Sequence, residues 1–210
     1  MESSPFTTEV VDSSSSLLSL LDNLAAIPPP STSIPALYVD LEGSLLSRNG
    51  SVSLVTICAL PGTTVYLADI HQLGKAAFET TNAAKVSLKS ALESPSIQKV
   101  FFDVRNDSDA LFAHFQITLD GVQDLQGMEL AARVGSKKLF SGLAKCIENH
   151  SPISRARKKE WTRRKDEMTR QFDAHAKGQL GIFRSTAAEC GHQTVLCRGC
   201  CASAGIIYRI

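Results

Sequence analysis

The sequence of 210 residues lacks any apolar run that approaches the roughly 20 residues a membrane-spanning helix requires. Its N-terminus has neither the basic start nor the apolar stretch of a secretion signal. A disulfide framework is also missing, because Cys58 and Cys146 stand alone in apolar patterns and the other four cysteines crowd into residues 190–201. These absences predict an intracellular protein, nuclear or cytoplasmic, that does not act at a membrane.

An even distribution of charge is lacking as well. Residues 1–135 hold 7 Lys and Arg against 15 Asp and Glu, whereas residues 136–210 hold 15 against 6. An acidic half can concentrate metal ions, and a basic half can hold phosphates. The alternative is that charged helix faces segregated by chance, and the charges alone leave both open.

The composition divides the chain into three predicted parts. Residues 1–35 are rich in Ser and Pro, which predicts a flexible leader with at most one or two helical turns. Residues 36–183 are long enough for one α/β domain. Residues 184–210 form an atypical tail.

Hydrophobic periodicity predicts the order of elements in the domain. Strands at 36–42, 52–59 and 64–68 are separated by short turns marked by Gly, which is typical of an antiparallel meander. The period then changes to that of helices, interrupted by short strands. The expected elements are a helix at 71–94, a strand at 98–104, a helix at 106–115, a strand near 122, and helices at 125–133, 138–148 and 152–175. This order predicts a mixed sheet with flanking helices.

Two carboxylates interrupt the first strand, "LYVDLEG" at residues 37–43. Alternation along a strand places Asp40 and Glu42 on the same face, with their Cα atoms about 6.5 Å apart. Two like charges this close repel each other and lose solvation unless a cation compensates them. The pair therefore predicts a cation site.

A third carboxylate, Asp107, opens the predicted helix at 106–115. It lies three and four residues before Ala110 and Leu111 in the apolar stripe, so it should face inward. If the strand at 98–104 pairs with the strand at 36–42, all three carboxylates converge. Such a group suits Mg²⁺ or Mn²⁺ and the phosphoryl chemistry of two-metal sites. The alternative is that Asp107 only caps its helix.

Asp40-Leu41-Glu42 and the segment "KVFFDVRNDSDALFAHFQITLDGVQDLQ" at 99–126 resemble two motifs of the DEDD 3'-5' exonucleases. The resemblance covers residues 36–150 and is to the ribonuclease D and Werner exonuclease type, of ribonuclease H-like fold. It is closest to the Egalitarian-type branch, whose second motif is similar to "HDCRNDSDAL". Here Phe102 stands where relatives often carry His.

The resemblance implies a domain that hydrolyses phosphodiester bonds at 3' ends of RNA or DNA. Asp40, Glu42 and Asp107 would be the catalytic residues and the ligands of two Mg²⁺ or Mn²⁺ ions. Asp109 competes with Asp107, and the position of the helix start favours Asp107. Asp124 matches a recurrent Asp of the family and would support the site without ligating a metal.

The family's third motif, a Tyr or His four residues before a fourth carboxylate, is missing from the sequence. Residues 195–207 can be encoded by codons that, read one nucleotide later, give "YCAGDVVHLPALF", which contains such a motif. We therefore hypothesise a changed reading frame near Phe183. A zinc site is the alternative for the tail; its ligands would be Cys190, His192, Cys197 and Cys200. The missing motif also favours an alternative function, a catalytically inactive module that binds nucleic acid or serves as a scaffold.

The segment at 154–170 holds eight basic and three acidic residues around Trp161. One interpretation is a helix that contacts the phosphate backbone, with Trp161 against a base. The other, which we favour, is a solvated helix with Trp161 anchored in a core.

Overall fold

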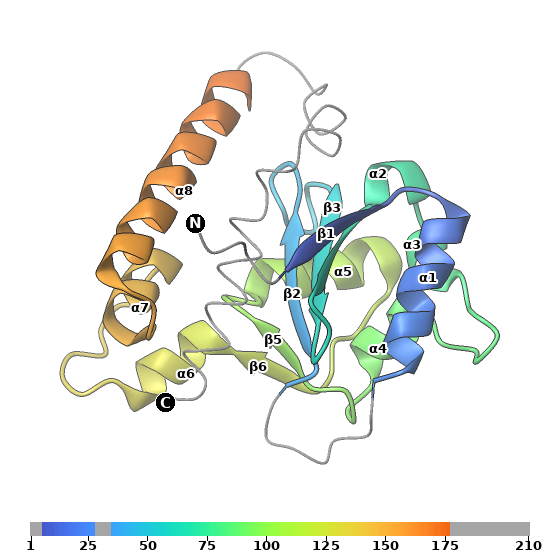
Figure 1. Ribbon diagram of the computed structural model, residues 1–210, viewed down its shortest axis with the longest axis horizontal. Helices are drawn as coiled ribbons and strands as arrows, with labels where there is room; N and C mark the ends of the chain where they lie inside the picture. The colour runs from blue at the N-terminus through green and yellow to red at the C-terminus, as the bar shows by residue number, and fades with distance from the viewer. Residues whose placement is uncertain (1–5, 28–34, 177–210) are drawn as a thin grey trace. The chain divides into compact units, whose positions relative to one another are not determined.

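The structure is a computed structural model that describes residues 6–27 and 35–176 (Figure 1). It divides after Asp124 into two units, which we describe separately. Unit 1 ends at that residue, and unit 2 begins at Leu125. The predicted tail at 184–210, with its reading-frame and zinc hypotheses, lies outside the described residues.

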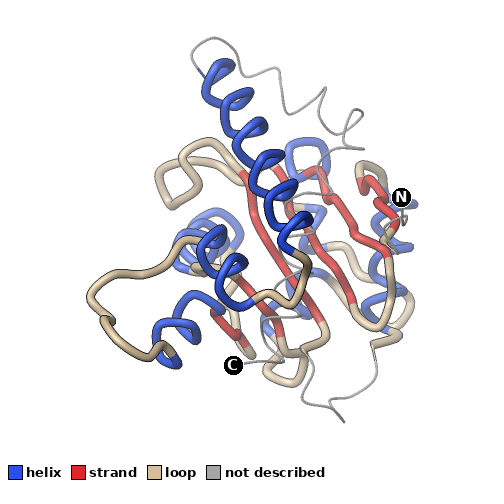
Figure 2. Tube along the Cα trace, turned by 60° about the vertical axis from the view of Figure 1, so that its left-hand side comes forward, coloured by secondary structure: helices blue, strands red, loops and turns tan. Residues whose placement is uncertain are grey.

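Unit 1 is built on a six-stranded mixed sheet with the order β1-β4-β3-β2-β5-β6 (Figure 2). The strands are β1 (Thr7–Val11), β2 (Leu37–Glu42), β3 (Leu54–Ala59), β4 (Thr64–Asp69), β5 (Lys99–Phe101) and β6 (Val122–Asp124). The predicted α/β class with a mixed sheet is confirmed, and the predicted meander is antiparallel β2-β3-β4. The strand that carries Asp40 and Glu42 is therefore in the interior of the sheet.

Strand β2 has different partners on its two sides. It pairs with β3 along its whole length, from Leu37 opposite Ala59 to Glu42 opposite Leu54. On the other side it pairs in parallel with β5, where Leu37 is opposite Lys99 and Tyr38 opposite Val100. Strand β5 runs only to Phe101, shorter than the predicted 98–104. This pairing is the one on which the predicted convergence of carboxylates depended.

The helices of unit 1 contribute to one apolar core together with alternate residues of the sheet. They are α1 (Ser14–Ala25), α2 (Ile70–Leu73), α3 (Ala76–Glu79), α4 (Leu88–Glu93) and α5 (Arg105–Phe115). Leu37, Val39 and Leu41 of β2 belong to this core with residues of all five helices. Because side chains alternate along a strand, Asp40 and Glu42 project from the opposite face.

The prediction of a flexible leader is wrong for residues 7–25. Strand β1 pairs in parallel with β4, and α1 has twelve residues, longer than one or two turns. The serine run that suggested flexibility contains a capping box between Ser13 and Ser16. The leucines that follow repeat at helical spacing and are buried; they are Leu17, Leu20, Leu21 and Leu24.

The single helix predicted at 71–94 is also wrong, because the segment forms the three short helices α2, α3 and α4. Gly74 ends α2 with a φ of +57°, a value that Gly adopts without the steric cost of a Cβ atom. Lys85 precedes α4 with a φ of +60°, and Ser87 forms a capping box with Ser90. Helix propensity averaged over the whole segment does not register these local signals, which end one helix and begin another.

Unit 2 contributes α6 (Leu125–Ala132), α7 (Leu143–His150) and α8 (Arg155–Ala176) among the described residues. The prediction was close for the first and last, but α7 begins at 143 rather than 138. Residues 133–142 form a connection whose conformation is fixed by side-chain hydrogen bonds, described below. None of the helices in the described ranges is long and apolar enough to cross a membrane.

Candidate active site

Strand β2 presents the first two acidic side chains of the candidate site. Asp40 lies opposite Thr56 of β3, and Glu42 lies opposite Leu54. Both acidic residues are partly buried, and Thr56 is buried. The strand's interior position therefore holds the two carboxylates on a well-supported backbone, with Gly43 immediately after them.

Asp107 lies in the first turn of α5, and it is buried, with only 7% of its surface exposed. Its Oδ1 accepts a hydrogen bond from the backbone N–H of Leu41 over 3.1 Å. The cap position of the helix is occupied by Val104, so Asp107 does not have the position of a helix cap. Its carboxylate is instead hydrogen-bonded to Leu41, the residue between Asp40 and Glu42.

The three carboxylates influence one another's ionisation. Burial raises the pKa of Glu42 to about 8, and the negative charges of Asp40 and Asp107 add to the effect. Burial, followed by the charge of Asp40, raises the pKa of Asp107 to about 7, although hydrogen bonds from backbone N–H groups oppose the shift. A bound cation would reverse these effects by favouring the ionised forms.

The donor chemistry of this group fits a divalent metal ion. All three side chains offer carboxylate oxygens, the ligands that Mg²⁺ and Mn²⁺ prefer. Their mutual repulsion is the electrostatic signature of an anionic site. In the described part of the chain, however, no three His, Cys, Asp or Glu side chains are gathered closely enough to ligate one ion as they stand.

Asp109, the competing candidate for the second motif, has a different partner. Its Oδ2 accepts a hydrogen bond from the backbone N–H of Arg48, and its Oδ1 accepts one from Arg48 Nε, both over 2.8 Å. This pairing lowers the pKa of Asp109. Sequence reasoning missed Arg48, since a single Arg in a Gly-rich turn gives no signal of its distant partner.

Asp124 supports the connection between β5 and α5. Its Oδ1 accepts a hydrogen bond from the backbone N–H of Asp103 over 2.9 Å. Asp103 has a φ of +64°, which is unusual for a residue with a side chain, and its carboxylate pairs with Arg105. Asp124 therefore holds the turn that leads into the helix of Asp107.

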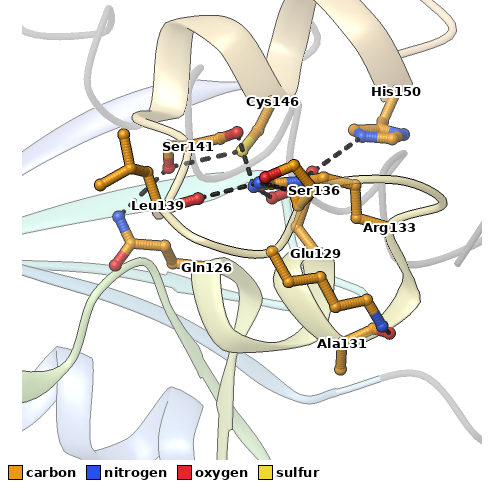
Figure 3. A network of polar contacts seen from close by, with 10 residues as sticks. Gln126, Glu129, Ala131, Arg133, Ser136, Leu139, Ser141, Cys146 and His150 are labelled. Carbon is orange, nitrogen blue, oxygen red and sulfur yellow. Dashed lines mark hydrogen bonds and ion pairs between the residues drawn. The ribbon is translucent and has the colours of Figure 1, made fainter.

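Unit 2 contains a buried polar network centred on Arg133 (Figure 3). Its guanidinium binds both carboxylate oxygens of Glu129, and His150 lies 3.5 Å from the same carboxylate. Arg133 also donates to the backbone oxygens of Ser136 and Leu139. The network therefore fixes the connection between α6 and α7. Sequence reasoning missed it, although Glu129 and Arg133 have the i,i+4 spacing of a helical ion pair.

Trp161 of the basic helix α8 is buried. Only 6% of Trp161 is exposed, and Lys165 Nζ lies 5.4 Å from the ring centroid. This burial agrees with the interpretation of Trp161 as a core anchor. Arg155 and Lys159 are exposed in the first turns of the helix.

Comparison with known proteins places the chain in a family. A sequence model described as 3'-5' exonuclease matches residues 8–167. No curated protein sequence matches the chain.

Solved structures of ribonuclease D share the fold. Trypanosoma brucei RNase D in complex with RNA U12 is 24% identical over 71% of this chain and 48% of its own, with a TM-score of 0.58. Escherichia coli RNase D is 18% identical over 92% of this chain and 51% of its own, with a TM-score of 0.50. The chain thus spans about half the length of these enzymes. By its family match, which includes both predicted motifs, the chain belongs to the DEDD 3'-5' exonuclease family.

Proposed function

We propose that this chain is a 3'-5' exonuclease domain whose Asp40, Glu42 and Asp107 bind divalent cations and whose substrate is single-stranded RNA or DNA. The observation that carries the proposal is the hydrogen bond from Leu41 to Asp107. It brings the carboxylate of the second motif to the strand that carries the first. The family match supports nuclease chemistry at this place in the chain.

In this proposal each carboxylate has a defined task. Asp40 and Glu42 supply oxygen ligands from a rigid strand, and Asp107 supplies one from a helix start fastened to that strand. Mg²⁺ or Mn²⁺ bound by them would supply the charge that activates a water molecule and stabilises the leaving oxygen. Asp124 acts indirectly, because it supports the backbone before α5.

The T. brucei RNase D structure contains RNA, which supports nucleic acid as the substrate class here. RNA and DNA differ by the 2'-hydroxyl, and contacts to it decide between them. Strands of the same sequence in both chemistries should therefore be offered in one assay. Preference for either is then read directly from the rates.

We also propose that catalysis by this chain is reduced, because its sequence lacks a recognisable third motif. A missing ligand should weaken the binding of one cation and remove part of the charge stabilisation of the transition state. The reading-frame hypothesis offers a remedy. A chain whose tail is encoded in the shifted frame from residue 183 onward should be the more active one.

The test measures degradation of 5'-labelled single strands in Mn²⁺, comparing this chain with the frame-restored chain. We expect progressive shortening from the 3' end that is faster with the restored chain, and loss of it on Asp40→Asn. Glu79→Gln is the matched control, because Glu79 is an exposed acidic residue on α3 of the same unit. If neither chain shortens either strand, or if Asp40→Asn does not lower the rate, the exonuclease proposal is wrong.

A second candidate function, an inactive nucleic-acid-binding module, is favoured by the charge of unit 2. Residues 133–159 hold eight Lys and Arg against one acidic residue, Glu148. Cations of this density bind phosphate backbones in a salt-dependent manner. Fluorescence anisotropy with labelled single strands would test it, since Arg155→Gln with Lys159→Gln should weaken binding and lower its salt dependence. The matched control is Lys75→Gln with Lys85→Gln, two exposed cations of unit 1.

A further inference from the structure

The loop between β2 and β3, residues 43–53, is fastened to α5 by side chains outside the carboxylate group. Arg48 and Asp109 share three hydrogen bonds, two from the guanidinium and one from the backbone N–H of Arg48. A fourth contact joins His114 Nε2 of α5 to the backbone oxygen of Ser47 over 3.0 Å. The loop is therefore held against the helix at two successive residues.

Backbone hydrogen bonds join the two sides of the loop that carries Arg48, and one of them reaches Glu42. The backbone N–H of Ser53 donates to the oxygen of Glu42 over 2.7 Å, and that of Ser51 donates to Ser44 over 2.9 Å. Gly43 approaches the opposite side so closely that a Cβ atom there would lie 1.8 Å from the Ser51 oxygen. A loop crossed by such short contacts moves with the end of β2.

The other partner, Asp109, is closer still to the site along the chain. It lies in the same helix as Asp107, two residues further on. The Arg48–Asp109 pair thus joins the loop that follows β2 to α5, the helix that carries Asp107. The His114–Ser47 contact joins the same loop and helix, and the hydrogen bond between Leu41 and Asp107 joins β2 itself to α5.

Electrostatics explains why these two elements need a tie. When Asp40 and Glu42 on β2 and Asp107 on α5 are all ionised, as ligation of a cation requires, their like charges push the strand end and the helix start apart. The opposite charges of Arg48 and Asp109 resist that separation. The pair is exposed, with 70% of the Arg48 side chain and 25% of the Asp109 side chain accessible, so its contribution to folding should be small.

We propose that Arg48 and Asp109 are positioning residues that keep β2 and α5 close enough for Asp40, Glu42 and Asp107 to close around a divalent cation, which would draw the three carboxylates together. This inference rests on the proposed function, because it concerns the same three carboxylates. It assigns a role to an acidic residue of the second motif that is not itself a ligand.

The direction in which Arg48→Ala changes the affinity for the cation separates a positioning role from a purely electrostatic one. Arg48→Ala removes a positive charge near the site, and Coulomb's law alone would then make cation binding tighter. Loss of positioning makes it weaker. Asp109→Ala removes all three hydrogen bonds with Arg48, whereas Arg48→Ala leaves the backbone N–H free to donate, so Asp109→Ala should have the larger effect.

A matched control exists in the same unit. Glu93 forms an exposed ion pair with Lys89 and also accepts a hydrogen bond from the distant backbone N–H of Thr118. It thus repeats the interactions of Asp109 away from the carboxylates. Glu93→Ala should cost as much thermal stability as Asp109→Ala and leave cation binding unchanged.

The experiment measures the affinity of the full chain for Mn²⁺ by electron paramagnetic resonance of the free ion, without nucleic acid. We expect Asp109→Ala to bind Mn²⁺ about tenfold more weakly, the range found for residues that support metal ligands. Arg48→Ala should bind more weakly by a smaller factor, and the double variant should match Asp109→Ala.

The possible results have distinct meanings. If the unaltered chain does not bind Mn²⁺, both the proposed function and this inference are overturned. If it binds Mn²⁺ and Asp109→Ala or Arg48→Ala binds equally or more tightly, only the inference is overturned. A loss of affinity in Glu93→Ala equal to that in Asp109→Ala would also overturn it, because the effect would then reflect general destabilisation.

Discussion

Asp107 accepts a hydrogen bond from the backbone N–H of Leu41 over 3.1 Å, so a buried acid of α5 is attached to the strand residue between two further acids. Side chains on either side of Leu41 point to the face opposite its own. The Leu41 N–H therefore holds the Asp107 carboxyl beside the strand residues that carry two further carboxyl groups. In the proposed cation site, this arrangement would favour cation binding over the stability of the metal-free protein.

Substitution of Asp107 by Asn should therefore make the metal-free protein more stable. Asn keeps an oxygen that can accept the Leu41 hydrogen bond, but it removes a carboxyl group whose ionisation is opposed by burial and by the charge of Asp40. We expect the metal-free protein to gain roughly 1–2 kcal/mol of unfolding free energy. Urea denaturation with and without Mn²⁺ would measure it, and Mn²⁺ should stabilise the unaltered protein only. A variant less stable than the parent in the absence of metal would contradict the prediction.

Asp124 offers a test of a supporting carboxylate. Asp124→Ala removes the acceptor for the Asp103 N–H in a turn with unfavourable backbone geometry, so we expect a loss of about 1–2 kcal/mol in unfolding free energy. Asp124→Asn retains an acceptor and should lose less. Thermal denaturation of both variants measures the difference. Equal losses would mean that the charge of Asp124, rather than its hydrogen bond, is what matters.

In the Arg133 network of unit 2, we expect that substituting both members of the Glu129–Arg133 pair lowers the unfolding free energy less than substituting Arg133 alone. Arg133→Met leaves the Glu129 carboxylate, only 3% of which is exposed, without its main partner, so we expect a loss of unfolding free energy. The double variant Glu129→Met with Arg133→Met leaves no unpaired buried charge and should cost less than Arg133→Met alone. Chemical denaturation of the three proteins decides it. A double variant that loses as much stability as Arg133→Met, or more, would show that packing, not charge, dominates there.

Lys99 predicts a dependence of stability on alkaline pH. It is fully buried, donates to the backbone oxygens of Ser94 and Ile97, and burial lowers its pKa to about 8. Between about 8 and the normal lysine value the unfolded chain binds more protons than the folded one, so stability rises with pH across that window.

The measurement compares urea denaturation of the parent and Lys99→Met from pH 7.5 to 10.5. Relative to the variant, the parent should gain on the order of 1–2 kcal/mol as pH rises. The comparison with Met cancels the titration of other groups. A difference between the two proteins that does not change with pH would contradict the lowered pKa.

The sequence predicted the elements whose patterns are local and regular. Alternation in β2 and the spacing of Ala110 and Leu111 in α5 were sufficient to orient Asp40, Glu42 and Asp107 before the fold was known. The predicted order of the meander was right for the same reason, since its turns are short. The fold class followed from that order.

The failures involve signals that compete over a few residues. Ser13 and Ser16 belong to a run that is typical of flexible segments, yet their side chains form a capping box before a leucine stripe. Gly74 and Lys85 end and precede helices through single backbone dihedral angles, which average propensity does not register. Long-range pairs such as Arg48 with Asp109 depend on tertiary structure and have no local pattern.

Strand β1 has a consequence for any shorter version of the protein. It covers the edge of the sheet by pairing with β4 at five successive positions, and α1 buries four leucines beside it. A fragment that begins at residue 36, where the motif resemblance starts, would leave the backbone of β4 open along that edge. Open edges of apolar strands recruit strands from other molecules. Such a fragment should aggregate before its chemistry could be measured, whereas one that begins ahead of Thr7 keeps its edge strand.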